Sequence, residues 1–193
     1  MTMPPGLRKF ALATHLSVSV GWIGAVVAYL ALSAASMTSQ DALTVRAAWI
    51  AMELAGWFAI VPLALASVLT GLVMALATNW GLFRHYWVLI SFVLTVVATV
   101  VLLLHMPDVS VLADIARRVE SGGLDGPDRH LYARLDDGDL LHPALGLVVL
   151  LVIQVLNVYK PRGITPYGQR RDEEQRRALQ RSKQQQMRRA SQA

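Results

Sequence analysis

The sequence contains four long apolar runs, at about 10–36, 47–78, 86–106 and 140–159. A helix needs roughly 20 mostly apolar residues to cross about 30 Å of hydrocarbon, and each run reaches that length. Because lipid offers the backbone no hydrogen-bond partner, each run is expected to be a helix. The sequence therefore predicts an all-α integral membrane protein, with residues 1–160 forming an antiparallel four-helix transmembrane bundle.

Charge is unevenly distributed along the chain. From Lys160 onward there are ten Lys or Arg and three Asp or Glu, whereas the 159 residues before it hold eight basic and ten acidic residues. Positive charge beside membrane spans stays in the cytoplasm, so the tail 161–193 is expected inside. Four spans then place the N-terminus inside as well, which agrees with Arg8 and Lys9. The expected location is a plasma membrane.

The basic tail is expected to be disordered or a solvated helix. Its charge favours contact with anionic lipid over binding of nucleic acid, which is not an expected partner. The segment 107–139 is expected outside the membrane. Within it, one helical face predicts an amphipathic helix lying on the outer surface and formed by Val109, Leu112, Ile115, Ala116 and Val119.

The first span carries two different faces. Small residues form one stripe, which predicts close packing against another helix or a second copy: Ser17, Gly21, Gly24 and Ala28. The other stripe contains His15, which lies about a turn and a half inside its helix. A hydrogen-bonded buried histidine and a haem ligand are both open interpretations of His15.

Three ionisable residues on different spans are expected at one depth near the outer boundary: Glu53, His105 and His142. Two imidazoles and a carboxylate form a coherent ligand set for a transition metal or a haem iron. Two alternatives stay open, since Glu53 could be protonated or paired with a histidine or Arg46, and the histidines could meet water. Hydroxyl groups that could orient a ligand are those of Ser19, Tyr29 and Thr95. The chain has no cysteine, so thiolate ligands and c-type haem attachment are excluded.

The spacing of His15, Trp22 and Gly24 resembles the first helix of the CopD copper-resistance family and of HemJ-type protoporphyrinogen oxidases. The HemJ likeness implies a haem ligand at His15. The CopD likeness implies copper handling by the outer residues, with Met52 and Met106 as soft ligands for Cu(I).

A second string resembles a family of four-span membrane proteins, common in actinobacteria, that has no established activity. The string comprises Thr70-Gly71, the loop Asn79-Trp80-Gly81-Leu82-Phe83-Arg84, and Trp87-Val88-Leu89. This resemblance covers about half of the chain and implies the four-span fold.

The leading hypothesis is a multi-pass membrane protein that binds b-type haem or a transition metal such as copper for redox or metal handling. The cofactor ligands would be His105 and His142, with His15 as a separate inner candidate and Glu53 as a metal or proton partner. The alternative is a ligand-free scaffold or accessory subunit that acts through helix packing, as a homo-oligomer or with a membrane partner. Whether the chain is an enzyme is left open by the sequence.

Overall fold

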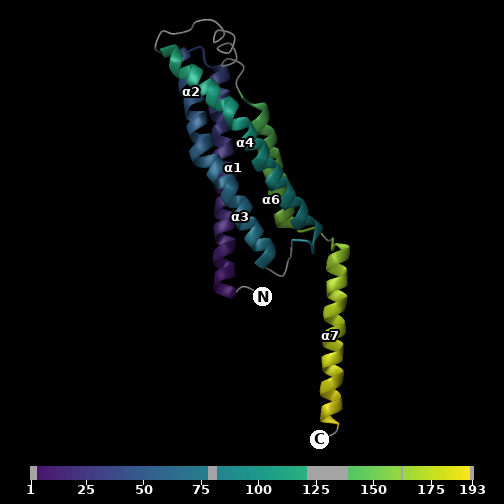
Figure 1. The fold of residues 1–193 in the computed structure, drawn as a ribbon. Helices are drawn as coiled ribbons and strands as arrows, with labels where there is room; N and C mark the ends of the chain where they lie inside the picture. The colour runs from purple at the N-terminus through teal and green to yellow at the C-terminus, as the bar shows by residue number, and fades with distance from the viewer. Residues whose placement is uncertain (1–3, 78–81, 121–138, 162, 192–193) are drawn as a thin grey trace.

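The computed structural model describes residues 4–77, 82–120, 139–161 and 163–191, and it is all-α (Figure 1). In chain order its elements are α1 (Pro5–Thr38), α2 (Ala42–Ala55), the π-helical turn η1 (Gly56–Ile60), α3 (Val61–Ala77), α4 (Tyr86–Glu120), α6 (Leu141–Tyr159) and α7 (Pro166–Ala190). Because α2, η1 and α3 follow one another without a break, they form a single long rod.

Four helices are long and apolar enough to cross a membrane, as the sequence predicted. They are Pro5–Thr38, Ala42–Leu76, Tyr86–Arg118 and Leu141–Tyr159. Large apolar side chains cover the outside of the bundle; Phe58 and Leu104, for example, are 80% and 73% exposed. Such a surface is suited to lipid rather than to water.

The second span begins earlier than the apolar run, because Asp41 caps it. The Asp41 carboxylate accepts hydrogen bonds from the backbone N–H groups of Leu43 and Thr44 and from the Thr44 hydroxyl. These bonds, led by the one from the Thr44 side chain, lower the pKa of Asp41 below its usual 3.8. The polar start of α2 is thus part of the helix.

The structure differs from the prediction of a separate helix on the outer surface. Residues 108–120 are helical, but α4 continues through Pro107 without a break. The predicted apolar face is buried in the core beside α2 residues such as Val45 and Trp49, and consists of Val109, Leu112, Ile115 and Ala116. The side chain of Val119 lies outside the described residues. Because α2 covers this face, no membrane surface is needed to bury it.

The π-helical turn η1 lies just before Pro62, and its Gly56 packs against the Met106 side chain of α4. The Val61 N–H donates to the Gly56 carbonyl, a wider turn than the α-helical one. A Cβ on Gly56 would lie 2.5 Å from Met106 Cε and 2.6 Å from its Sδ. The absence of a side chain on Gly56 therefore leaves room for the end of the Met106 side chain.

The small-residue stripe on α1 is mostly turned away from the rest of the chain. A Cβ on Gly21 would contact the Leu63 side chain at 3.5 Å, whereas a Cβ on Gly24 would meet nothing within 4 Å. Ser17 and Ala28 are exposed. Within the described chain, the stripe thus packs against a neighbouring helix only at Gly21.

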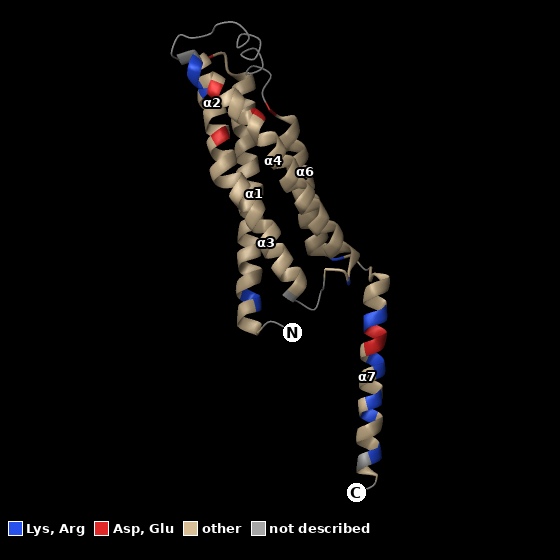
Figure 2. Ribbon diagram, viewed as in Figure 1, with Lys and Arg blue, Asp and Glu red and all other residues tan. Residues whose placement is uncertain are grey.

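The start of α7 is fixed to the end of the bundle where α1 begins (Figure 1). Arg84 Nη2 lies 2.6 Å from Asp172 Oδ1, and the Thr165 hydroxyl donates to the Phe83 carbonyl. Beyond this contact α7 extends away from the bundle, with basic side chains along its length (Figure 2). The tail therefore forms an exposed helix.

Candidate metal centre

The strongest polar cluster is centred on Asp139, immediately before α6. The Asp139 side chain is buried and bonded on several sides. Its Oδ2 lies 2.6 Å from His105 Nε2 and accepts a hydrogen bond of 2.8 Å from the Tyr29 hydroxyl. The Asp139 N–H donates to Ser33 Oγ at 3.0 Å. Side chains from α1 and α4 thus fix both the backbone and the carboxylate at the start of α6.

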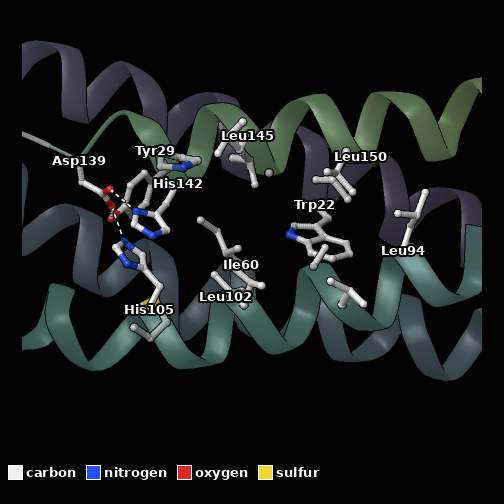
Figure 3. A pocket seen from close by; sticks show the side chains of 18 residues that line it. Trp22, Tyr29, Ile60, Leu94, Leu102, His105, Asp139, His142, Leu145 and Leu150 are labelled. Atoms are coloured by element: carbon white, nitrogen blue, oxygen red, sulfur yellow. Dashed lines mark hydrogen bonds and ion pairs between the residues drawn. The ribbon is translucent and has the colours of Figure 1, made fainter.

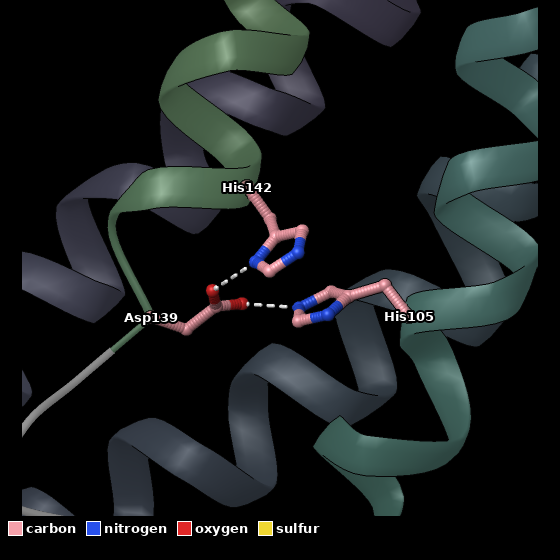
Figure 4. A group of neighbouring side chains, drawn as sticks. All are labelled: His105, Asp139 and His142. Atoms are coloured by element: carbon pink, nitrogen blue, oxygen red, sulfur yellow. Dashed lines mark hydrogen bonds and ion pairs between the residues drawn. The ribbon is translucent and has the colours of Figure 1, made fainter.

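His142 completes the cluster from the first turn of α6. Its Nδ1 lies 3.6 Å from Asp139 Oδ1. The rings of His105 and His142 are stacked, with centroids 4.1 Å apart and planes inclined by 14° (Figure 4). One carboxylate therefore faces two imidazoles, with a different oxygen toward each ring.

Charge around Asp139 favours the ionised carboxylate. Burial alone raises the pKa of Asp139, but the hydrogen bond and charge of His105, with smaller effects of Tyr29 and His142, outweigh burial and lower it. The positive end of the α6 dipole lies beside the same group. Asp139 is thus held in the form that binds a cation.

The spacing of these three side chains fits a metal site. One ligand atom from each of His105, Asp139 and His142 lies within 4.8 Å of the other two. Imidazole and carboxylate ligands suit several first-row transition metals. Tyr29 holds the Asp139 carboxylate and Ser33 holds the Asp139 backbone, as the outer hydrogen-bond partners of metal ligands commonly do.

The cluster lies at one end of an apolar cavity of about 270 Å³ between α1, α4 and α6 (Figure 3). Trp22, Leu94 and Leu150 lie toward the other end, and the walls between are mainly aliphatic. Any ion held by the cluster would therefore face both the end of the bundle at which α6 begins and an apolar chamber.

The structure brings together two of the predicted outer residues and leaves the third apart. His105 and His142 meet, as the sequence indicated, whereas Glu53 pairs with Arg117. Arg117 Nη1 also lies 2.8 Å from Asp114 Oδ1. Because α4 continues past Pro107, it supplies Glu53 with a cationic partner outside the metal cluster.

The other predicted ligands lie elsewhere. His15 is in the half of the bundle away from the cluster, where its Nδ1 is 2.8 Å from Thr70 Oγ1. Met106 lines the cavity beside the cluster, whereas Met52 is fully buried in the core.

Sequence reasoning missed Asp139, the residue that joins the two histidines. It belongs to an acidic segment in which eight carboxylates look alike. The available signal was its position three residues before His142, which puts both side chains on one face at the start of a helix. Tyr29 is one of the hydroxyl residues expected to orient a ligand, and it does bond to Asp139.

Comparison with known proteins adds no family: no protein-family model, curated protein or solved structure matches the chain.

Proposed function

We propose that this membrane protein binds one transition-metal ion through His105, Asp139 and His142. The observation that supports the proposal is the mutual approach of the three ligand atoms within 4.8 Å. The buried carboxylate is held by Tyr29 and by the backbone contact to Ser33, so the set is partly preorganised. Copper(II) is the preferred ion, since it stands highest among divalent first-row metals at nitrogen and oxygen ligands.

Three protein ligands do not fill the coordination sphere of a transition-metal ion. A metal ion held by two imidazoles and one carboxylate keeps coordination positions open to an outside ligand. The apolar cavity beneath the cluster would admit a lipid-soluble molecule to those positions. The proposed function is therefore metal handling or metal-dependent redox chemistry at the outer boundary of the plasma membrane.

The geometry favours an ion over b-type haem at this pair. Two axial histidines bind a haem from opposite faces of the porphyrin, whereas these rings stack directly on each other at 4.1 Å. A haem between them would require one ring to move away. His15 remains a haem-ligand candidate through the resemblance alone.

The proposed location is a bacterial plasma membrane with both termini in the cytoplasm. In support, α1 begins and α7 starts at the same end of the bundle, and the basic residues of α7 are at that end (Figure 2). Anionic lipid is the proposed contact of α7.

Metal analysis of the protein purified in detergent tests the proposal. After loading with Cu²⁺ and desalting, we expect stoichiometric copper in the parent chain and its loss in the double variant H105A/H142A. His85→Ala is the matched control, because His85 lies outside the cluster, near the start of α4. Absence of retained copper, zinc and iron from the parent chain would contradict the proposal and favour the ligand-free scaffold. Equal retention by the double variant would contradict the assigned ligands.

A further inference from the structure

A second cavity, of about 430 Å³, lies in the inner half of the bundle between α1, α3, α4 and α6. Trp22 and Leu150 line both this cavity and the outer one. Its lining is more polar than that of the outer chamber and includes His15, Ser19, Ser67, Ser91, Thr95 and Asn157. Hydroxyl, amide and imidazole groups thus meet inside a span-forming bundle, where unsatisfied polar groups are costly.

The hydrogen bonds of His15 define which of its nitrogens is available. Thr70 Oγ1 lies 2.7 Å from the Ala66 carbonyl, which can only accept, so the one Thr70 hydroxyl hydrogen is donated there. The His15 Nδ1 at 2.8 Å must then be the donor to Thr70. In the neutral ring Nε2 therefore carries no hydrogen and is an acceptor.

Gly71 gives the His15 ring room beside α3. A Cβ at position 71 would lie 3.3 Å from His15 Cε1, the atom next to Nε2. Across the described residues, no hydrogen-bond partner is found for Nε2. His15 Nε2 is thus available to accept a hydrogen bond from a ligand in the cavity.

Ser91 supplies the complementary donor. Its side chain is only 5% exposed, and its Oγ has no hydrogen-bond partner among the described residues. Thr95, one turn further along α4, uses its own hydroxyl to bond the Ser91 carbonyl and leaves Oγ alone. A buried hydroxyl without a partner is unfavourable, and turning the covered Ser91 Oγ toward the cavity that the residue lines would let it bond a ligand there.

The remaining lining restricts the class of ligand. Trp22, Trp87 and Phe92 provide aromatic surface. Within the described part of the chain, the lining contains no carboxylate, and its one charged side chain is Lys160. A metal cation would find no charged oxygen in this lining, whereas a neutral ring would find both aromatic walls and polar partners.

We propose that the inner cavity binds a neutral, lipid-soluble ring compound that carries both a hydroxyl donor and a carbonyl acceptor. The ligand hydroxyl donates to His15 Nε2, and the Ser91 hydroxyl donates to the ligand carbonyl. The site is separate from the metal cluster and does not depend on the proposed metal function.

A cysteine-protection assay tests this site, because the parent chain has no cysteine. Gln154→Cys places a single thiol in the lining of the cavity, and Val155→Cys places one on the exposed face of the same helix. Both variants, in lipid nanodiscs, are alkylated with N-ethylmaleimide in the presence of heptyl para-hydroxybenzoate. Heptyl para-methoxybenzoate, which lacks the donor hydrogen, is the matched probe.

We expect the hydroxy probe to slow alkylation of the Q154C variant saturably and to leave alkylation of the V155C variant unchanged. The lost hydrogen bond should weaken the protection about 5-fold for the methoxy probe, and similarly when His15→Ala or Ser91→Ala is added to Q154C. Equal protection by both probes, or full protection in the His15 and Ser91 variants, would overturn the proposal. Absence of saturable protection would do so too, as would a haem absorption band that disappears in His15→Ala.

Discussion

Gly56→Ala offers a quantitative test of how η1 packs against the Met106 side chain of α4. The new methyl group would lie 2.5 Å from Met106 Cε and 2.6 Å from Sδ, inside any normal contact. Met106 is only 1% exposed, so the new methyl group displaces the end of its side chain from the core toward the apolar cavity that it lines. Overpacking of this kind lowers the free energy of unfolding by about 1–3 kcal/mol.

The effect of Gly56→Ala on the free energy of unfolding should change from destabilising to stabilising when Met106 is shortened to alanine. In a Met106→Ala background the two clashing atoms are absent, and replacing glycine by alanine in a helix then gains about 0.5–1 kcal/mol. The double-mutant cycle should therefore give a coupling energy of about 1.5–4 kcal/mol. Gly24→Ala is the control in the parent background, since its Cβ meets nothing within 4 Å.

The assay is reversible unfolding by SDS in mixed micelles of the four proteins of the cycle and the Gly24→Ala control, followed by tryptophan fluorescence and circular dichroism. An equal loss of stability for Gly56→Ala in both backgrounds would refute the packing of the Met106 side chain against Gly56. A loss at Gly24 as large as that at Gly56 would show that a methyl group destabilises these helices wherever it is added.

Three further predictions concern the metal cluster, the start of α2 and the start of α7. Tyr29→Phe removes one donor to Asp139 and should weaken copper binding about 10-fold in a chelator competition, since partners of ligands contribute 10–100-fold; unchanged affinity would contradict the role of Tyr29. Asp41 has a folded pKa below 3.8, so its capping contribution is complete above that value and is lost as pH falls through the folded pKa. The protection factors of amide hydrogens at the start of α2, which are corrected for the pH dependence of intrinsic exchange, should therefore fall in acid, and Asp41→Asn should remove this fall; an identical fall in the variant would contradict the cap. Asp172→Asn breaks the ion pair with Arg84 and should speed tryptic cleavage in α7 while the free energy of unfolding of the bundle changes by less than about 1 kcal/mol; unchanged cleavage would show that the pair does not hold α7.

The four spans could be predicted from the sequence because apolar length decides whether a helix can cross a bilayer. Their ends could not be read from hydropathy. The polar start of α2 is helical because Asp41 caps it, and α4 passes Pro107 because α2 covers its apolar face. Both outcomes depend on contacts that a hydropathy profile does not contain.

Part of the candidate site could be predicted from the depth of its residues along the transmembrane helices. His105 and His142 lie on neighbouring antiparallel helices, so equal depth brought them together. Glu53 has a comparable predicted depth but pairs with Arg117, and that partner became available only through the continuation of α4. Asp139 could not be singled out, because its burial depends on Tyr29 and Ser33, more than a hundred residues earlier.

The central claim is that His105, Asp139 and His142 hold one metal ion. Pulsed electron paramagnetic resonance of the copper(II)-loaded protein tests it most directly, since the nuclear modulation reports how many imidazoles are coordinated. The parent chain should show two imidazoles and His142→Ala one. An absence of bound copper(II), or the same two-imidazole signal in H105A/H142A, would contradict the claim.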